Sequence, residues 1–469
     1  MAVGLMETDY LVIGAGAMGM AFTDALIDHA DVHVTLVERR TSAGGHWRDA
    51  YPFVQLHQAS VFYGVASTVL GTGAVQATGP EAGLQERARQ VQICDYYDDI
   101  LDRAFVGSGR VTFMGASDYQ YDGSRHLVTS SATGETTEVR VRKRVVDATY
   151  LSPSIPSQTP PPFRVADGVH VEPVNRLIEL SPDYRNFVIV GSGKTATDGI
   201  VWLLSNGVSP DRIMWVRPRE PWMLNRAIVQ PDPLLALGMA ADTMEAAAQA
   251  QSLDEMFLSL ESRGVMLRID QGVVPTMAKG PTLGMWELDL LRSVEHVVRL
   301  GHITGISSDA IVLAEGSVPL PPNALVVHCA APGLKYPPRV PIWGPDQIRL
   351  QTIRAGNPCF NAALTGYVEA TRDDDAECNR LCPPNSLPDS PASWAQMQRR
   401  AVMALRSFGA EPDIAAWANS CVLNPTRVDP ALANDPAVQQ AASRAAAHTD
   451  AGLEQLRLLA PEPSGNQLA

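Results

Sequence analysis

The sequence predicts an α/β protein with two Rossmann-like dinucleotide-binding domains and a helical C-terminal extension. Two glycine-rich turns, at residues 14–19 and 191–196, each come directly after a short run of β-branched apolar residues. A helical segment and a second apolar run follow each turn, which is the βαβ order of a dinucleotide-binding unit. Residues 435–459 are rich in alanine and other strong helix formers, so this part of the chain is predicted to be helical.

The composition indicates a globular chain with a large core. The chain has 469 residues, of which 45% are hydrophobic and 19% charged, which is enough to bury a core in two or three lobes. Acidic residues outnumber basic ones by 51 to 37, and no run of Lys or Arg stands out, so nucleic acid is not an expected partner. The N-terminus lacks a basic region, and no apolar stretch reaches the roughly 18 residues of a membrane helix. We therefore expect a cytoplasmic protein without a membrane segment.

The cysteines do not predict a disulfide framework or a metal site. Six cysteines are few for this length, and no pair of CxxC motifs with zinc-ligand spacing is present. Cys378 and Cys382 could lie on one face of a helix, but redox-active pairs usually have the spacing CxxC or CxxxxC. A catalytic disulfide is therefore a minor alternative.

The first glycine turn has the features of a dinucleotide site. Gly14 permits a tight turn, Gly16 lets the backbone approach a pyrophosphate, and Gly19 lets the following helix pack closely on the strand. Glu38 ends the second strand, where a carboxylate can accept hydrogen bonds from an adenosine ribose and repel a 2′-phosphate. An ordinary glycine turn is the alternative, but the complete strand, helix, strand and carboxylate pattern favours the dinucleotide site.

The second glycine turn repeats this pattern with a different charge. It contains Gly191 and Gly193, and Ala196 replaces the third glycine, which slightly loosens the packing of the helix. The second strand ends in Arg217, with Arg219 two residues later. Guanidinium groups suit a 2′-phosphate by charge and geometry, so this site favours NADPH over NADH. The alternative is that both arginines are solvated surface charges.

Two further motifs resemble the flavin-dependent monooxygenase superfamily. A GGxW segment shortly after the ribose carboxylate belongs to the FAD site of that superfamily, and Gly44, Gly45 and Trp47 match it. Members often carry GxGxSAxD at the second site, where this chain has Thr195 in place of the serine. Lys194 could add a charge near the pyrophosphate or be a solvated lysine. The resemblance implies FAD at the first turn, held by Gly14, Gly16, Ala17, Gly19, Glu38, Arg39, Gly45, His46 and Trp47, and NADPH at the second, held by Gly191, Gly193, Lys194, Thr195, Arg217 and Arg219.

The resemblance also implies that the NADPH domain is inserted in the FAD domain. Residues 147–150 resemble the ATG-like strand end that such flavoproteins place near FAD, and a proline-rich crossing follows. The apolar run 324–331 resembles the second element of this kind, with which such chains return to the FAD domain. We therefore expect a first FAD-binding part at 1–162, the NAD(P)H-binding domain at 163–300, a second FAD-binding part at 301–392 and a helical extension at 393–469.

Two cofactors in one chain imply a hydride path. NADPH reduces FAD, and the reduced flavin then passes electrons to oxygen, a disulfide or another carrier. Without a convincing redox cysteine pair, O2 is the leading acceptor, and we expect a monooxygenase acting on a small organic substrate. The alternatives are a non-oxygenating reductase that passes electrons to a quinone, thiol or protein, and a cofactor-binding protein with a regulatory or structural function.

The segment 51–65 follows the GGxW motif and is the candidate oxygen site. In N-oxygenating members of the superfamily a similarly placed segment carries an asparagine near the flavin, whereas this chain has His57 there and Gln58 beside it. Histidine can donate a hydrogen bond but titrates near neutrality, so the handling of oxygen could differ. A structural role for His57 is the alternative. The Baeyer–Villiger fingerprint FxGxxxHxxxW is absent before the second glycine turn, which disfavours that subgroup, and the substrate is not specified.

Overall fold

The structure is a computed structural model that describes residues 4–331 and 333–462. Its first α/β body is a sheet with the strand order β3-β2-β1-β6-β5-β4, in which β19 also pairs with β6. β3, β2, β1, β6 and β19 run parallel, whereas β4 and β5 form an antiparallel extension of β6. The bounds are β1 Gly4–Ile13, β2 Val34–Val37, β3 Val111–Met114, β4 Ser117–Tyr121, β5 His126–Ser130, β6 Thr136–Asp147 and β19 Gln347–Arg349.

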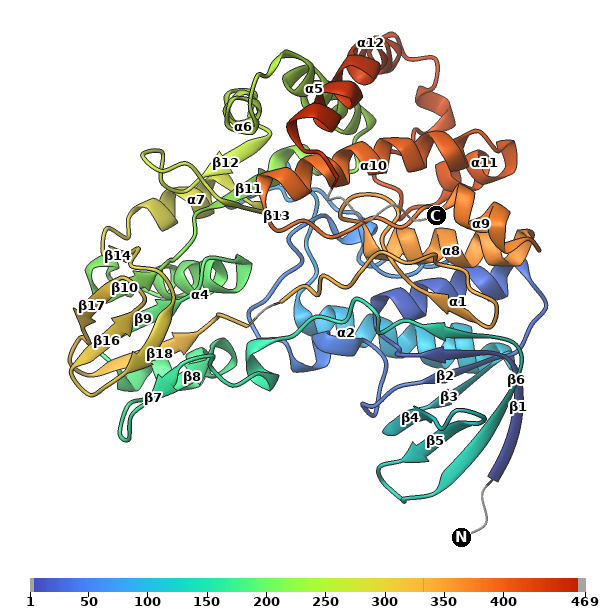
Figure 1. The fold of residues 1–469 in the computed structure, drawn as a ribbon, viewed down its shortest axis with the longest axis horizontal. Helices are drawn as coiled ribbons and strands as arrows, with labels where there is room; N and C mark the ends of the chain where they lie inside the picture. The colour runs from blue at the N-terminus through green and yellow to red at the C-terminus, as the bar shows by residue number, and fades with distance from the viewer. Residues whose placement is uncertain (1–3, 332, 463–469) are drawn as a thin grey trace.

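Helices cover one face of this first sheet. Successive residues of β1 face opposite sides, because side chains alternate along a strand. Tyr10 and Val12 pack into the larger core with residues of several helices, whereas Leu11 packs into a smaller cluster on the other face. Three of these helices are α1 (Ala17–His29), α2 (Gln90–Asp99) and α8 (Pro358–Thr371). In Figure 1, α8 lies along α1 although it comes late in the chain.

The second α/β body is a parallel sheet with the order β14-β10-β9-β18-β8. Phe187 and Ile189 of β9 face one core cluster and Val188 and Val190 face another, so this central strand is buried on both faces. A smaller sheet lies beside this parallel sheet. Its strands β17, β16 and β15 are antiparallel neighbours, and β7 pairs with β15 at its edge. The bounds are β7 Arg164–Val165, β8 Val171–Pro173, β9 Asn186–Val190, β10 Ile213–Val216, β14 Val297–Val298, β15 Ile303–Ile306, β16 Ala310–Leu313, β17 Gly316–Pro319 and β18 Ala324–His328, with helices α3 Leu177–Leu180, α4 Lys194–Ser205 and α7 Met285–Arg292.

The predicted end of the second domain at residue 300 is wrong. The apolar run expected to return to the first domain forms β18, which pairs with β9 on one side and β8 on the other. A continuous apolar run suits a strand buried on both faces, so it fits the middle of either sheet equally well by sequence. The second body therefore extends to His328, and the return to the first sheet is made by β19.

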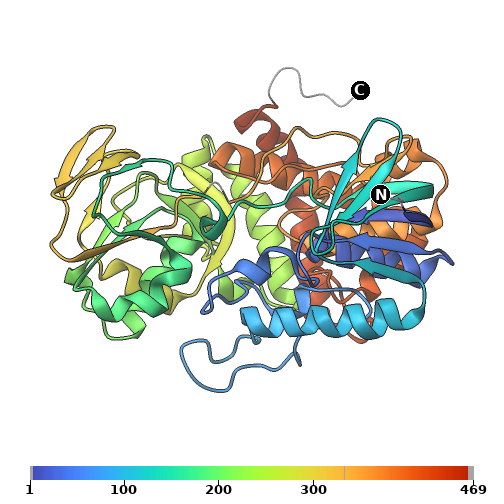
Figure 2. The same cartoon turned by 90° about the horizontal axis from the view of Figure 1, so that it is seen from below.

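A third lobe joins a segment of the second domain to the C-terminal helices. The sheet β12-β11-β13 and the helices α5 and α6 share a core cluster with α10 and α12. Gly452 of α12 lets that helix lie against α5, because a side chain there would meet the backbone of Met244. Figures 1 and 2 show the red and orange C-terminal helices beside this green segment. The bounds are β11 Pro221–Asn225, β12 Met266–Arg268, β13 Met277–Leu283, α5 Pro233–Gln249, α6 Leu253–Ser262, α9 Asp375–Leu381, α10 Pro391–Gly409, α11 Pro412–Ser420 and α12 Pro436–Leu459.

Among the residues that the structure describes, no helix combines the length and the apolar character needed to cross a bilayer.

Candidate functional site

The first glycine turn leaves the start of α1 open. Gly14 has φ +100°, and a side chain at Gly19 would overlap the carbonyl oxygen of Gly14, so the fold itself requires both glycines. Gly16 is different, because an added Cβ would only reach the Cα of Gly45, at 3.7 Å. Gly16 is the N-cap of α1 and supplies no side-chain cap. The first-turn N–H groups of α1 can therefore receive an anion.

The double-glycine motif lies directly on this turn. The N–H of Gly44 donates to the carbonyl of Ala15 at 2.8 Å, and a Cβ on Gly45 would come within 2.8 Å of the Cα of Gly16. Trp47 is buried, and its indole N–H donates to the hydroxyl of Tyr63 at 2.6 Å. The structure thus brings the two glycine motifs together at the N-terminus of α1.

His46, which follows the double glycine, stacks on the Trp47 ring with a centroid distance of 5.3 Å. Burial, with a smaller contribution from the charge of Arg40, lowers the pKa of His46 to about 4. The imidazole is therefore neutral near pH 7, where it presents one donor and one acceptor nitrogen.

A buried carboxylate stands at the end of β2, as predicted from its spacing. Glu38 is 4% exposed, and its Oε2 accepts a hydrogen bond from the N–H of Ala15 at 2.9 Å. Its Oε1 forms an ion pair with Arg40 at 3.2 Å. Arg39, which is predicted to help hold FAD, donates a hydrogen bond to Gln158 in the interdomain crossing at 3.2 Å. Arg40 is the basic residue that contacts the carboxylate, a distinction that spacing alone does not make.

The second glycine turn has the same open start. Gly191 has φ +136°, and a Cβ there would lie 3.0 Å from the carbonyl oxygen of Cys329. Gly193 is the N-cap of α4, and an added Cβ would meet nothing within 4 Å. Ala196 is fully buried in the core between α4 and the sheet. Like the first turn, the second turn therefore leaves room for a ligand to approach the backbone at the start of its helix. Unlike the first turn, it accommodates a methyl group where the helix packs on the sheet.

Lys194 begins α4 but is already paired with carboxylates. Its ammonium contacts Asp198 one turn later and lies 3.8 Å from Glu287. Thr195 lies next to the hydroxyl of Tyr51. Lys194 is thus neither solvated nor without partners.

The two arginines after β10 have different surroundings. Arg217 is 2% exposed, its Nε lies 2.9 Å from Glu220, and its guanidinium stacks over Trp215 at 4.2 Å. Burial lowers the pKa of Arg217 to about 10, so the side chain remains cationic near pH 7. Arg219 instead forms an ion pair with Asp389 at 2.9 Å. The structure does not bring these two arginines together as one clamp.

A cavity of about 430 Å³ lies at the carboxyl ends of β10 and β14, next to Arg217. In open parallel sheets, ligands bind beyond the carboxyl ends of the strands. Its charged lining residues are Arg217, Asp270, Arg292, Glu295 and Arg299. Arg219 is not part of this lining.

The segment 51–58 connects the two glycine turns. The hydroxyl of Tyr51 donates to Asp198 of α4 at 2.7 Å. The carbonyl of His57 accepts hydrogen bonds from Arg226 Nε, at 3.2 Å, and from the hydroxyl of Thr282. The segment is therefore attached to the second domain at Tyr51 and to the third lobe at His57.

The His57 side chain does not titrate as the sequence suggested. It is half-buried, and its Nδ1 is enclosed without a hydrogen-bond partner among the described residues. Burial, and then the nearby charges of Lys194, Arg226 and Arg87, lower the pKa of His57 to about 3, so the expectation of titration near neutrality is wrong. Gln58 is 7% exposed, and its amide has no hydrogen-bond partner in the part of the chain that the structure describes.

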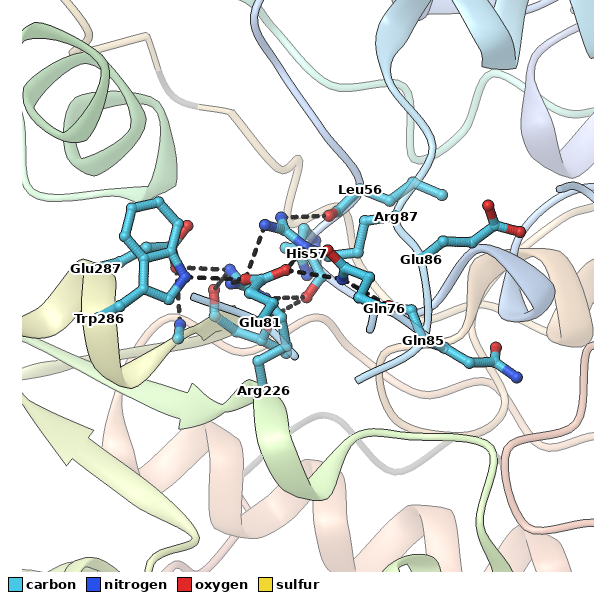
Figure 3. A network of polar contacts seen from close by, with 12 residues as sticks. Leu56, His57, Gln76, Glu81, Gln85, Glu86, Arg87, Arg226, Trp286 and Glu287 are labelled. Carbon is cyan, nitrogen blue, oxygen red and sulfur yellow. Dashed lines mark hydrogen bonds and ion pairs between the residues drawn. The ribbon is translucent and has the colours of Figure 1, made fainter. Parts of the chain in front are cut away.

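Sequence reasoning missed a buried ion network beside His57, shown in Figure 3. Arg226 is fully buried and forms ion pairs with Glu81 and Glu287, the latter at 2.7 Å. Glu81 also pairs with Arg87, at 2.8 Å. Both carboxylate partners of Arg226 lie far from it in the chain, so no local spacing could have indicated them.

Residues 12–70 match the family described as NAD(P)-binding Rossmann-like domain. Uncharacterized proteins of Mycobacterium tuberculosis and Mycobacterium bovis are each 40% identical over 422 residues, which is 89% of this chain and 78% of theirs. The polycyclic ketone monooxygenase of the fungus Thermothelomyces thermophila matches 99% of this chain and 89% of its own, with 12% identity and a TM-score of 0.54. A flavin-containing monooxygenase from Stenotrophomonas maltophilia matches 88% of this chain and 99% of its own, with 13% identity and a TM-score of 0.43. The fold is that of the flavin monooxygenases, as the sequence motifs predicted.

Proposed function

Because this chain belongs to the same family as the uncharacterized mycobacterial proteins and has the fold of a flavin monooxygenase, we propose that it is an FAD- and NADPH-dependent monooxygenase of a small organic substrate. The observation that carries the proposal is the path of one segment between the two glycine turns. Gly45 lies against Gly16 of the first turn, and Tyr51, six residues later, bonds Asp198 of the second-turn helix. Groups bound at the two turns would therefore meet beside the same stretch of chain.

The first turn fits FAD. The open N-terminus of α1 suits the pyrophosphate, with Gly16 and Ala17 at its start and the backbone of Gly45 facing it. The carboxylate of Glu38 lies beside the turn, where it can accept hydrogen bonds from ribose hydroxyls. Bound FAD supplies a hydride acceptor and a reaction with O2, while the protein supplies position and electrostatics.

The second turn fits NADPH with one change to the expected residues. Gly193 leaves the start of α4 open, and Lys194 and Thr195 begin that helix. The cavity beyond β10 and β14 suits the adenosine end of the coenzyme. Since Arg217 lines this cavity while Arg219 bonds Asp389, we assign the contact with a 2′-phosphate to Arg217.

The candidate oxygen site consists of His57 and Gln58. Both belong to the connecting segment, and the enclosed Nδ1 of His57 has no partner among the described residues. A neutral imidazole can donate or accept one hydrogen bond without introducing a charge. This arrangement suits an oxygen site, because exclusion of water prevents loss of reactive species as hydrogen peroxide.

A disulfide acceptor within the chain is less well supported than O2. All six cysteines are buried and unpaired. Burial raises the pKa of Cys378 to about 12 and also raises the pKa of Cys382, so neither thiol is activated for exchange. Electron transfer from the reduced flavin to a quinone or a partner protein is the alternative to be tested.

A pair of glycine variants tests the assignment of the two cofactors. Gly16→Val should remove FAD from the purified protein, because its side chain would occupy the space between backbone and pyrophosphate. Gly193→Val should keep FAD but abolish its anaerobic reduction by NADPH. Both positions have room for a Cβ in the structure, so each variant should fold. Full FAD content in Gly16→Val, or normal reduction in Gly193→Val, would contradict the assignment.

Isotopically labelled O2 tests the reaction class. The wild-type protein, NADPH and a panel of ketones, thioethers and tertiary amines should give a product that carries one labelled oxygen atom, the other leaving as water. Formation of hydrogen peroxide alone, or rapid transfer to a quinone under nitrogen, would instead support the reductase.

A further inference from the structure

Arg226 uses every nitrogen of its guanidinium inside the protein. The side chain is fully buried, and the residue follows β11 of the third lobe. Its Nε donates to the carbonyl of His57 and to the hydroxyl of Thr282, both at 3.2 Å. Its two other nitrogens bond Glu81 and Glu287 (Figure 3). Arg226 therefore joins the His57 segment to two carboxylates from different parts of the chain.

The surrounding charges balance and form a continuous chain of ion pairs. Arg226 stands between Glu81 and Glu287, Arg87 pairs with Glu81, and Lys194 lies near Glu287. Lys194 in turn contacts Asp198, which accepts the Tyr51 hydroxyl bond described above. Buried charges are costly unless each is paired, so moving one member would leave another without compensation. This chain of pairs ends at the two attachment points of the segment 51–57.

Thr282 contributes a second donor to the same carbonyl. It lies in β13, is 2% exposed, and its hydroxyl donates to the carbonyl of His57. A carbonyl held by two donors fixes the plane of its peptide, and with it the position of the His57 Cα from which the side chain leaves the backbone. The base of the enclosed imidazole is thus held by contacts made to the main chain.

We propose that Arg226 and Thr282 are positioning residues that hold the carbonyl of His57, and through it the imidazole, in a fixed place between the two dinucleotide turns. The inference rests on the proposed function, because it assigns the ion network to the oxygen site. It goes beyond that function by naming residues of the third lobe, which form their hydrogen bonds to His57 at its main-chain carbonyl. Water exclusion at His57 then depends on a hydroxyl and a guanidinium that touch neither cofactor turn.

A matched pair of threonine variants tests the inference. Thr282→Val removes the hydroxyl bond to His57 and the bond that this hydroxyl accepts from Arg226 Nε, and it leaves the ion pairs of Arg226 with Glu81 and Glu287 in place. Thr243→Val is the control, because Thr243 is 4% exposed and its hydroxyl donates to a different main-chain carbonyl, that of Met239, at 2.7 Å. Both changes remove a hydroxyl from a buried site, but only Thr282→Val removes contacts to His57 and Arg226.

The first readout is amide hydrogen exchange in protein without FAD. The amides of Leu56 and Ser60 flank His57 and bond the carbonyls of Ala88 and Glu86, so their exchange reports opening of the segment. Thr282→Val should accelerate exchange at these two amides by about tenfold, whereas Thr243→Val should leave it at the wild-type rate. Equal exchange in the two variants would overturn the inference.

The second readout uses FAD-loaded protein with NADPH and dissolved O2, without substrate. Thr282→Val should consume NADPH and release hydrogen peroxide several times faster than wild type, because water reaches the site. The rate of flavin reduction by NADPH under nitrogen should be unchanged. A general loss of stability would instead change both the release of hydrogen peroxide and the rate of flavin reduction. Peroxide release equal to that of Thr243→Val would overturn the inference. A wild-type protein that binds no FAD would contradict the proposed function instead, and the exchange readout would still decide the role of Thr282.

Arg226→Lys provides a second variant if Thr282→Val fails to fold. It keeps the positive charge between Glu81 and Glu287 but replaces the planar fork by a single ammonium. It should accelerate exchange at Leu56 and Ser60 in the same direction. Wild-type exchange in a folded Arg226→Lys protein would overturn the inference.

Discussion

The two glycine turns of this chain are similar in sequence but differ in how closely their helices approach the sheet. Gly19 cannot carry a side chain, because a Cβ would overlap the backbone of Gly14. Ala196 occupies the equivalent position of the second turn and is fully buried. The second position is open in both turns, at Gly16 and Gly193. The comparison shows that the third position of the glycine motif determines how closely the helix packs on the strand. The second position determines whether a ligand can approach the backbone.

The two strand ends differ in charge, yet each carries its own counter-charge. Glu38 forms an ion pair with Arg40 after β2, and Arg217 forms one with Glu220 after β10. Both charged groups are nearly buried, at 4% and 2% exposure. A ligand at either site must therefore compete with an existing ion pair or add a contact to it. The charge of a single residue thus determines only part of the selectivity of the site for its ligand.

The largest expected effect tests helix packing at the first turn. Gly19→Ala should lower the free energy of unfolding by about 3 kcal/mol or more, because the added methyl group overlaps a backbone oxygen that cannot move without shifting β1 or α1. Urea unfolding followed by circular dichroism measures this change. A loss below about 1 kcal/mol would show that α1 moves away from the strand easily, and the contrast with Ala196 would then disappear.

The segment between the two turns should make stability depend on pH. The pKa of His57 is about 3 in the folded chain, against an ordinary value of 6.5. Between these values the unfolded chain binds a proton that the folded chain does not, so stability is present above about pH 6.5 and falls as the pH decreases. At about pH 5 this loss is about 2 kcal/mol.

His57→Gln isolates this contribution. Wild-type protein should lose more stability than the variant when urea unfolding is compared at about pH 7.5 and about pH 5. His46 titrates in the same direction in both proteins and therefore cancels in the comparison. Parallel pH profiles of wild type and variant would show that His57 is protonated or solvated in the folded chain.

The parts of the fold that local patterns specify could be predicted from the sequence. Strand, glycine turn and helix follow one another within a few tens of residues at both sites, and Glu38 lies at the strand end that its spacing indicated. β18 could not be assigned, because an apolar run fits the centre of either sheet. The contact of α12 with α5, through Gly452 and Met244, joins segments far apart in the chain and has no local periodicity.

The candidate site was predictable only where a motif describes it. Gly45 lies against Gly16 of the first turn, as its motif suggested. Arg226 belongs to no motif, and its partners come from separate elements. The protonation of His57 was mispredicted because its pKa depends first on burial in the folded chain and then on charges contributed by other parts of the chain. Tertiary context decides such properties, since burial and distant charges both shift a pKa.

A smaller effect tests helix packing at the second turn. Ala196→Gly should lower the free energy of unfolding by about 1.5 kcal/mol, because it removes a buried methyl group and adds backbone freedom within α4. Urea unfolding measures the change, and the FAD content of the purified protein should be unaffected. An increase in stability would indicate that α4 moves closer to β9 and that the alanine is not needed to fill the space.

The smallest effect tests which arginine reads the 2′-phosphate. Arg217→Ala should weaken NADPH binding by about tenfold, or about 1.4 kcal/mol, while NADH binding changes little, because only NADPH carries the additional charge. Arg219→Ala is the matched control, since its guanidinium bonds Asp389 and does not line the cavity. It should leave the ratio of the two dissociation constants unchanged. The ratio is the useful measure, because any general weakening of the second domain affects both coenzymes equally. If the ratio changed only in Arg219→Ala, the pair with Asp389 would have to open when coenzyme binds, and the second strand end would select its ligand through a residue outside the cavity.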